Sequence, residues 1–292
     1  TVKVRYLIIG NSAGGIGAAE AVREVDKAGS IIMISDEPYP SYSRPLISEH
    51  LAGGYPLERM LFRSPDFYEK NNIRSFLGRK VTLLDIDKHA IALETGERFS
   101  WDRLLLATGG SPIIPEVAGI RRQGVCTFTT LDDAMAIDES LIGRESRVVV
   151  IGGGLIGVSV TEALVKRGVV VTVVEMKERI LNTILDEEAS ALEEEILRQA
   201  GVSVVTGHTV TEINDGSAQE DAVGSVTLDD GSQIPCSLVV IAIGVVPRVE
   251  LASGAGIKIN RGIVVNRHMA TSNPHVYACG DVAEAHDFIY SK

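Results

Sequence analysis

The stretch 147–175 restricts the possible folds of this chain more than any other part of the sequence. It opens with a run of β-branched residues, which is typical of a strand buried on both faces. Glycines follow in the pattern Gly152-x-Gly154-x-x-Gly157, then comes a helical pattern of apolar residues, and Glu175 ends the next strand. In that order the glycines allow a tight turn, the approach of a pyrophosphate to the backbone, and close packing of helix on strand. The helix N-terminus would bind the phosphates, and the Glu175 carboxylate would bind a ribose. The stretch therefore predicts a dinucleotide-binding βαβ unit.

The chain contains this arrangement a second time, near its beginning. An apolar strand over 4–9 leads into the glycine-rich turn 10–15 and a helix, and the strand after that helix ends before Asp36. Ser12 stands where the second glycine is expected, but its hydroxymethyl group still allows the backbone to approach a phosphate, and its hydroxyl can donate to one. Two such sites imply two bound dinucleotides, and transfer between them is the simplest use of the pair.

Composition limits the class of protein. The chain has 292 residues, 45% of them apolar and 23% charged, which suits a globular protein of two domains. No stretch is apolar enough to span a membrane and no signal-peptide pattern is visible, so we expect a soluble, cytoplasmic protein without membrane partners. The cysteines Cys126, Cys236 and Cys279 are far apart, which argues against a redox-active disulfide and a cysteine metal site. A net charge of −11 argues against nucleic acid as a partner.

Smaller motifs lie between and after the two units. The turn 107–109, Ala-Thr-Gly, follows a buried strand, which places small residues at the edge of a sheet where ligands bind in open α/β folds. The turn 242–244 is similar. Near the end of the chain, Gly280 and Asp281 follow a short strand. The Asp281 carboxylate could accept a hydrogen bond from a polyol chain or cap a helix.

The rest of the chain predicts alternating helices and strands. Arg44 opens a short helix that stops at Gly53, and it is either part of a surface connection or a clamp for a phosphate. Further helices are expected over 65–72, 130–142 and 186–200. The stretch 111–115, Ser-Pro-Ile-Ile-Pro, predicts a stiff linker at a domain boundary.

In this order the motifs resemble the pyridine nucleotide-disulfide oxidoreductase superfamily of FAD proteins. The run Tyr42-Ser-Arg44-Pro45-Leu is similar to the branch of rubredoxin and ferredoxin reductases, NADH oxidases and the flavin part of NADH-nitrite reductases. The resemblance implies an α/β fold of two Rossmann-like, three-layer dinucleotide-binding domains. It places a discontinuous FAD domain at 1–116 and 247–292, with an NAD domain inserted at 117–246.

The resemblance also assigns cofactor-binding residues. FAD is expected at Gly10, Ser12, Ala13, Gly14, Gly15, Asp36, Arg44, Val81, Ala107, Thr108, Gly109, Gly280 and Asp281. NAD is expected at Gly152, Gly154, Leu155, Ile156, Gly157, Glu175 and Gly244. No metal is implied. Since hydride transfer needs stacked rings rather than a proton donor, no catalytic side chain is assigned with certainty.

The sequence departs from the family pattern in three places. The region directly after the first βαβ unit carries no cysteine, which argues against disulfide reduction. Glu49 stands where relatives often carry Lys and Ser159 where they carry Glu, so these two residues are candidates near the flavin, with solvent exposure of Glu49 and packing of Ser159 as the alternative. The sequence stops soon after Asp281, before the position at which the resemblance implies a C-terminal interface domain, so we expect that domain to be absent.

These features together predict an FAD-dependent NADH oxidoreductase. Electrons would pass from NADH to FAD and then to a separate acceptor, a small iron–sulfur or rubredoxin-type protein. Oxygen as acceptor, which would make the protein an NADH oxidase, is one alternative, and a redox-sensing FAD and NADH binding protein is another. Docking of an acidic carrier would need a local basic patch, for which four residues are candidates: Arg59, Arg63, Arg121 and Arg122.

Overall fold

The computed structural model describes residues 1–141, 146–216 and 219–285. Contacts between Cα atoms divide the chain into two compact units. Unit 1 comprises Thr1–Ser43, Met60–Ser111 and Val246–Lys292, and unit 2 comprises Arg44–Arg59 and Pro112–Val245. The segment Arg44–Arg59 therefore groups with unit 2, whereas the family resemblance places it in the FAD domain, within residues 1–116. The cause is packing, because the helix α2 (Ile47–Leu51) lies against α5 (Leu131–Leu141) and α6 (Leu155–Lys166).

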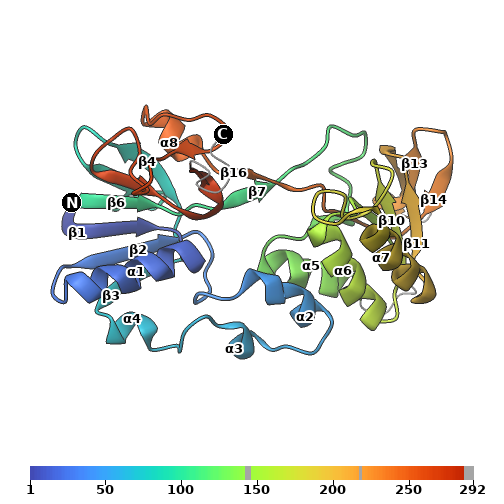
Figure 1. Ribbon diagram of the computed structural model, residues 1–292, viewed down its shortest axis with the longest axis horizontal. Helices are drawn as coiled ribbons and strands as arrows, with labels where there is room; N and C mark the ends of the chain where they lie inside the picture. The colour runs from blue at the N-terminus through green and yellow to red at the C-terminus, as the bar shows by residue number, and fades with distance from the viewer. Residues whose placement is uncertain (142–145, 217–218, 286–292) are drawn as a thin grey trace. The chain divides into compact units, whose positions relative to one another are not determined.

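Unit 1 is built on a parallel sheet (Figure 1). Its parallel strands stand in the order β3-β2-β1-β6, and β18 pairs with β6 in the same direction. At its N-terminal end, β6 pairs antiparallel with β5, and β5 pairs antiparallel with β4. The strands are β1 (Val2–Ile9), β2 (Ile31–Ser35), β3 (Ile73–Leu77), β4 (Val81–Asp85), β5 (Ala90–Leu93), β6 (Arg98–Leu106) and β18 (Val276–Ala278).

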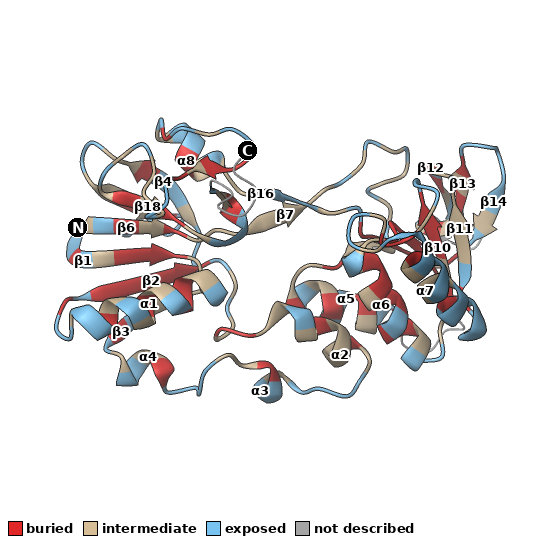
Figure 2. Ribbon diagram, viewed as in Figure 1, coloured by how far each residue is buried: buried red, intermediate tan, exposed pale blue. Residues whose placement is uncertain are grey.

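Alternating side chains bury both faces of this sheet. Ile31 and Met33 of β2 belong to a cluster with α1 (Ala13–Val25) and α4 (Phe67–Lys70). Ile32 and Ile34 belong to the larger cluster on the other face, which includes residues of the hairpin, of α8 (Glu250–Gly254) and of the segment after it. Figure 2 shows the central strands of unit 1 as mostly buried ribbons. The continuous apolar run of β2 is what a strand covered on two faces requires.

Unit 2 has the same plan. Its parallel sheet has the order β11-β10-β9-β15-β8. The helix α6 packs against β9 and β10, and a three-stranded antiparallel sheet contributes to the apolar cluster that holds Val149 and Ile151. The elements are β8 (Val125–Thr127), β9 (Arg147–Ile151), β10 (Val170–Glu175), α7 (Glu187–Gln199), β11 (Ser203–Thr206), β12 (Val210–Gly216), β13 (Gln219–Leu228), β14 (Gln233–Pro235) and β15 (Leu238–Ile241).

Several elements are very short. They are η1 (Arg44–Leu46), α3 (Leu57–Met60), β7 (Gly110–Pro112), β16 (Val245–Pro247), β17 (Ile263–Val264), η2 (Gly280–Val282) and β19 (Ala283–Glu284). The stretch predicted as a linker at 111–115 begins in β7, which pairs with β16, and the chain crosses between the two units within these strands. Within the ranges that the structure describes, no helix has both the length and the apolar character needed to cross a bilayer.

Both units are Rossmann-like α/β structures, as the sequence predicts. Each contains a glycine-rich turn between a central strand and its first helix. In sequence order, the main segment of unit 2 lies between two segments of unit 1.

Candidate functional site

The first glycine turn lies where the carboxyl ends of β1 and β6 meet. Gly10 has a φ of +121°, and a Cβ atom at this position would lie 2.1 Å from the Ala107 carbonyl oxygen. The Gly10 N–H donates to the Ile34 carbonyl at 2.8 Å, and the Ala107 N–H donates to the Ile9 carbonyl at 2.7 Å. Only glycine fits a turn that needs both the left-handed conformation and this close approach.

The second turn repeats this geometry in unit 2. Gly152 has a φ of +106°, and a Cβ atom there would lie 2.5 Å from the Ala242 carbonyl oxygen. Its N–H donates to the Val174 carbonyl, and the Ala242 N–H donates to the Ile151 carbonyl, both at 2.8 Å. The turn at Ala242 thus has the same place in unit 2 that the turn at Ala107 has in unit 1.

The third glycine of each turn packs helix on strand. A Cβ atom at Gly15 would lie 2.0 Å from the Gly10 carbonyl oxygen, and one at Gly157 would lie 1.9 Å from the Gly152 carbonyl oxygen. These positions meet the protein's own backbone and have no room for a side chain.

Other glycines face open space. A Cβ atom at Gly154, Gly109 or Gly280 would have nothing within 4 Å apart from its chain neighbours. Gly154 has an ordinary φ of −81°, so no backbone constraint of its own calls for glycine there. Space in front of Gly154 is what a pyrophosphate lying against the backbone requires, and this arrangement fits a dinucleotide.

The helices that follow the two turns leave their N-termini open. Ser12 is the N-cap residue of α1 and Gly154 that of α6, and neither helix has a side-chain cap. By contrast, the Asp186 side chain caps α7 by accepting from the Ala189 N–H at 2.9 Å. Both α1 and α6 therefore offer backbone N–H donors, including those of Leu155 and Ile156 in α6, to an anion.

Glu175 is buried at the end of β10 and holds the second turn. Its carboxylate accepts from the Gly153 N–H at 2.6 Å and from the Lys177 N–H at 2.8 Å, one bond to each oxygen. The Gly153 carbonyl in turn accepts from the Leu181 N–H at 2.7 Å. Each carboxylate oxygen keeps a second acceptor direction, so Glu175 can position the turn and also accept ribose hydroxyls. The positioning contacts are not visible in the sequence pattern.

Asp36 follows β2 and pairs with Arg248, a residue that the sequence analysis did not single out. The Arg248 guanidinium lies 3.0 Å from the Asp36 carboxylate, and its Nε donates to the Ser111 hydroxyl at 2.8 Å. The Thr108 hydroxyl donates to the Arg248 carbonyl at 3.0 Å. A contact between residues so far apart in the chain leaves no local signal in the sequence.

The remaining FAD candidates are spread over both units. Arg44 begins η1 in unit 2, where its guanidinium donates to the Thr129 carbonyl at 2.8 Å. Val81 is half-buried at the start of β4, and Asp281 is exposed in η2 of unit 1. The NAD candidate Gly244, in unit 2, has a φ of +117°, and its carbonyl accepts from the Ile113 N–H at 2.9 Å.

Glu49 and Ser159 both belong to unit 2. The Glu49 carboxylate pairs with Lys166 Nζ at 3.1 Å, and both side chains are about half exposed. Ser159 is half-buried in α6. The Glu49 carboxylate therefore has a counter-ion from α6, which the sequence comparison with relatives does not indicate.

All three cysteines are free thiols. Burial raises the pKa of Cys126 to about 11 and that of Cys236 to about 12, and it also raises the pKa of Cys279. The thiolate is the nucleophilic form, so these side chains are poor nucleophiles at neutral pH.

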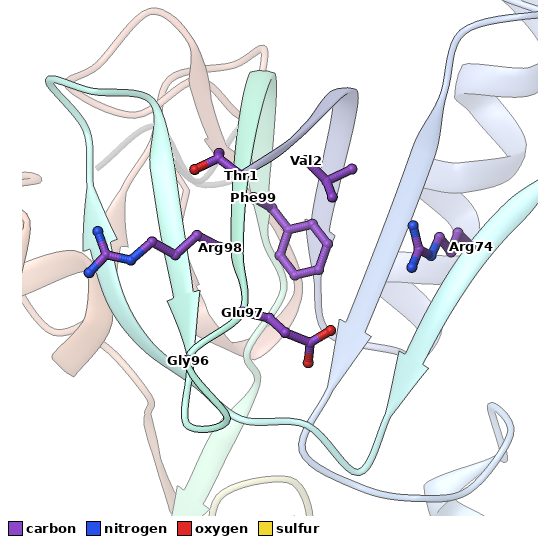
Figure 3. A pocket seen from close by; sticks show the side chains of 7 residues that line it. All are labelled: Thr1, Val2, Arg74, Gly96, Glu97, Arg98 and Phe99. Carbon is purple, nitrogen blue, oxygen red and sulfur yellow. The ribbon is translucent and has the colours of Figure 1, made fainter.

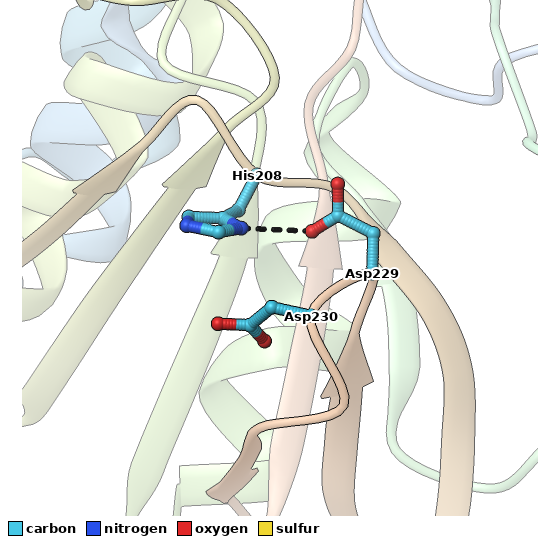
Figure 4. Close-up of side chains that lie close together, drawn as sticks. All are labelled: His208, Asp229 and Asp230. Atoms are coloured by element: carbon cyan, nitrogen blue, oxygen red, sulfur yellow. Dashed lines mark hydrogen bonds and ion pairs between the residues drawn. The ribbon is translucent and has the colours of Figure 1, made fainter.

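One group of possible metal ligands occurs among the described residues. Ligand atoms of His208, Asp229 and Asp230 lie within 4.8 Å of one another (Figure 4). His208 Nδ1 already shares a hydrogen bond with Asp229 at 2.8 Å, and both aspartates are exposed. We assign no metal to this cluster.

A cavity of about 360 Å³ lies at the opposite end of unit 1 from the glycine turn. It is lined by Thr1, Val2, Arg74, Gly96, Glu97, Arg98 and Phe99 (Figure 3). Val2 and Phe99 face each other across β1 and β6 at the amino end of β1. Ligands of open α/β sheets bind at the carboxyl ends of the strands, so this cavity is not the expected dinucleotide site.

Comparison with known proteins places these features in a family. The sequence profile of the pyridine nucleotide-disulphide oxidoreductases matches residues 4–291. The putidaredoxin reductase CamA of Pseudomonas putida is 35% identical over 290 residues, which are 98% of this chain and 68% of the relative. A rubredoxin-NAD(+) reductase of the same species is 31% identical over 285 residues, which are 97% of this chain and 73% of the relative.

Solved structures agree with the sequence matches. The crystal structure of a covalent putidaredoxin reductase–putidaredoxin complex has a TM-score of 0.92 and 34% identity to this chain, over 100% of this chain and 70% of that one. Some curated relatives are much longer, and the chain spans only 35% of a nitrite reductase of Bacillus subtilis. Repeated glycine turns, matching folds and the profile over nearly the whole sequence lead to one conclusion. The chain belongs to the pyridine nucleotide-disulphide oxidoreductase family.

Proposed function

We propose that this protein is an FAD-dependent NADH oxidoreductase that passes electrons to a separate carrier protein. The observation that carries the proposal is the duplicated glycine cradle, with Gly10 and Gly152 closed against backbone carbonyls in the same way. Family membership supports FAD and NAD as the two dinucleotides.

Unit 1 is the FAD domain and unit 2 is the NAD domain in this proposal. The FAD residues in unit 1 are the turn 10–15, Asp36, Val81, the turn 107–109 and Gly280 with Asp281. The NAD residues are Gly152, Gly154, Leu155, Ile156, Gly157, Glu175 and Gly244. Arg44 remains an FAD candidate, although its guanidinium donates to Thr129 of unit 2.

The protein contributes binding and orientation. Uncapped N-termini of α1 and α6 attract the two pyrophosphates, and the glycine turns let them reach the backbone. When bound, FAD supplies the chemistry that accepts a hydride from NADH and releases electrons one at a time. The three cysteines are free thiols, and in this proposal the electrons leave through a separate acceptor.

The acceptor is a small iron–sulfur or rubredoxin-type protein. The names of two relatives state reduction of putidaredoxin and of rubredoxin, which supports this class of partner. In unit 1, Arg63 is already paired with Glu20 at 2.7 Å, and in unit 2, Arg122 donates to the Ile213 carbonyl. Arg59, Arg63 and Arg121 are exposed, whereas Arg122 is half-buried.

Anaerobic titration tests the proposal. The protein loaded with FAD is mixed with NADH in a stopped-flow instrument, and bleaching of the flavin absorbance is followed. Reduced protein is then mixed with a ferredoxin, a rubredoxin or oxygen. Fast reduction by NADH and fast reoxidation by a carrier are expected. Slow reduction would favour a redox sensor, and reoxidation by oxygen faster than by any carrier would favour an NADH oxidase.

NADH is preferred over NADPH because of Glu175. The buried carboxylate accepts ribose hydroxyls but repels a 2′-phosphate. Substitution Glu175→Ala should raise KM for NADH about tenfold, since charged hydrogen bonds are lost, and should lower the ratio of kcat/KM for NADH over NADPH. Glu175→Gln is the matched variant, because it keeps an acceptor oxygen for the turn but removes the charge. Equal use of both nucleotides by the unmodified protein would contradict the carboxylate argument.

We also propose that the protein works in the cytoplasm. Free cysteines, which persist in a reducing compartment, support this location. Cell fractionation with an antibody to the protein would test it.

A further inference from the structure

Arg248 is tied to the turn 107–109 by its main chain. Its N–H donates to the Gly109 carbonyl at 2.9 Å, and its carbonyl accepts from the Thr108 hydroxyl at 3.0 Å. The side chain of Arg248 therefore starts from a fixed point at the carboxyl end of β6.

From that point the side chain reaches Asp36 after β2. Nε donates to the Ser111 hydroxyl at 2.8 Å, and Nη1 lies 3.0 Å from Asp36 Oδ2. In the sheet, β1 stands between β2 and β6, so this bridge passes over the carboxyl end of β1. The glycine turn 10–15 begins there, and all of these residues belong to unit 1.

We propose that Arg248 is a positioning residue for FAD, an inference that rests on the proposed function. The guanidinium holds one oxygen of Asp36 and leaves Oδ1 for a ribose hydroxyl. It also places a positive charge beside a carboxylate that would otherwise repel the pyrophosphate. Because Arg248 is fixed to Thr108 and Gly109, it couples the adenosine end of the site to the turn at Ala107.

The pair is accessible enough to be tested without unfolding the protein. Side-chain exposure is 31% for Arg248 and 49% for Asp36, so neither belongs to the buried core. The variants Arg248→Gln, Arg248→Lys, Asp36→Asn and the double variant Asp36→Asn/Arg248→Gln are titrated with FAD at two salt concentrations. Binding is followed by quenching of FAD fluorescence, and the melting temperature of each apoprotein is measured.

Arg5 supplies the matched control. It pairs with Asp26 in the same unit, also at 3.0 Å, but it lies in β1 well before the glycine turn. Arg5→Gln should bind FAD as the unmodified protein does.

Arg248→Gln should weaken FAD binding about five- to tenfold, as expected for loss of a partly exposed charged contact. Arg248→Lys should recover part of the loss because it keeps the charge but not the contact with Ser111. The double variant should bind FAD at least as tightly as the single variant that binds it less tightly. The salt dependence of FAD binding should fall when Arg248 is removed.

Two failures are distinguishable. If the unmodified protein binds FAD and Arg248→Gln binds it equally or more tightly, the role of Arg248 is overturned and the proposed function stands. Additive losses in the double variant would likewise overturn the coupling through Asp36. If the folded, unmodified protein takes up no FAD, the proposed function falls, and the role of Arg248 falls with it.

Discussion

At the scale of single residues, His208 shows how one contact sets a proton equilibrium. Its hydrogen bond to Asp229 is the main cause that raises the pKa of His208, and the same bond lowers the pKa of Asp229. A raised histidine pKa adds stability that is complete below the unfolded value of 6.5 and is lost as the pH rises through the folded value. For Asp229 the gain is present above its unfolded value of 3.8 and is lost as the pH falls through the folded value.

The pair is therefore most favourable between these two limits. We expect an NMR titration of the His208 ring to give a pKa above 6.5. Asp229→Asn should move this pKa down toward 6.5, since it removes the charged acceptor. Asp230→Asn is the control, because Asp230 is only a smaller, more distant influence on His208. A His208 pKa that is unchanged in Asp229→Asn would contradict the hydrogen bond.

Glu49 forms an ion pair with Lys166, and this pair bears on the predictions for both stability and the flavin potential. Its carboxylate lies 3.1 Å from Lys166 Nζ, and the two side chains are 41% and 52% exposed. Solvent screens such a pair, so Glu49→Gln should cost less than about 1 kcal/mol of folding free energy. Because water screens these half-exposed charges, the midpoint potential of the bound flavin should also stay the same in Glu49→Gln. A rise of that potential, measured in a redox titration, would show instead that the carboxylate acts on the flavin.

At the scale of elements, glycines of one turn have different jobs. A Cβ atom added at Gly157 would lie 1.9 Å from the Gly152 carbonyl oxygen, whereas a Cβ atom added at Gly154 would have nothing within 4 Å. Gly157→Ala should therefore cost about 3 kcal/mol or more of folding free energy. Gly154→Ala should fold with a loss of at most about 1 kcal/mol, since it changes only an N-cap residue.

Nucleotide binding should separate these variants further. The methyl group of Gly154→Ala occupies the space proposed for the pyrophosphate, so KM for NADH should rise about tenfold through lost charged hydrogen bonds. FAD content should stay unchanged, because Gly154 belongs to unit 2. Thermal melts and steady-state kinetics with NADH test both points. A normal KM in Gly154→Ala would place the pyrophosphate elsewhere.

The sequence predicts the long elements and the two turns because their signals are local. The strands β1, β2, β9 and β10 and the helices α1, α5 and α7 match the predicted periodicity within a few residues. The two-residue strands β17 and β19 leave no periodic signal, and they hold together through pairing with each other. Contacts of Arg248 with Asp36 and of Arg44 with Thr129 join distant segments, so no local pattern indicates them. The roles assigned to these residues stay predictions.

At the scale of the whole molecule, each unit has apolar clusters of its own. The clusters around Ile32 and Met33 belong to unit 1, and the cluster around Val149 belongs to unit 2. The only tryptophan of the chain, Trp101, is buried in unit 1 and stacks on His89 with ring centroids 4.5 Å apart. Its emission maximum therefore follows the unfolding of unit 1, while far-UV circular dichroism follows both units.

Each cofactor should stabilise the unit that binds it. A ligand at a hundred times its Kd adds about 2.7 kcal/mol to the folded state that binds it. FAD should raise the unfolding midpoint of unit 1, which Trp101 emission follows. NAD⁺ should raise only the unfolding midpoint of unit 2, which is seen by circular dichroism and not by Trp101 emission. Gly154→Ala is the control, since its response to NAD⁺ should be reduced and its response to FAD kept. If NAD⁺ moves the Trp101 midpoint as far as FAD does, the chain unfolds as one cooperative body and the assignment of one cofactor to each independent unit is wrong at the level of stability.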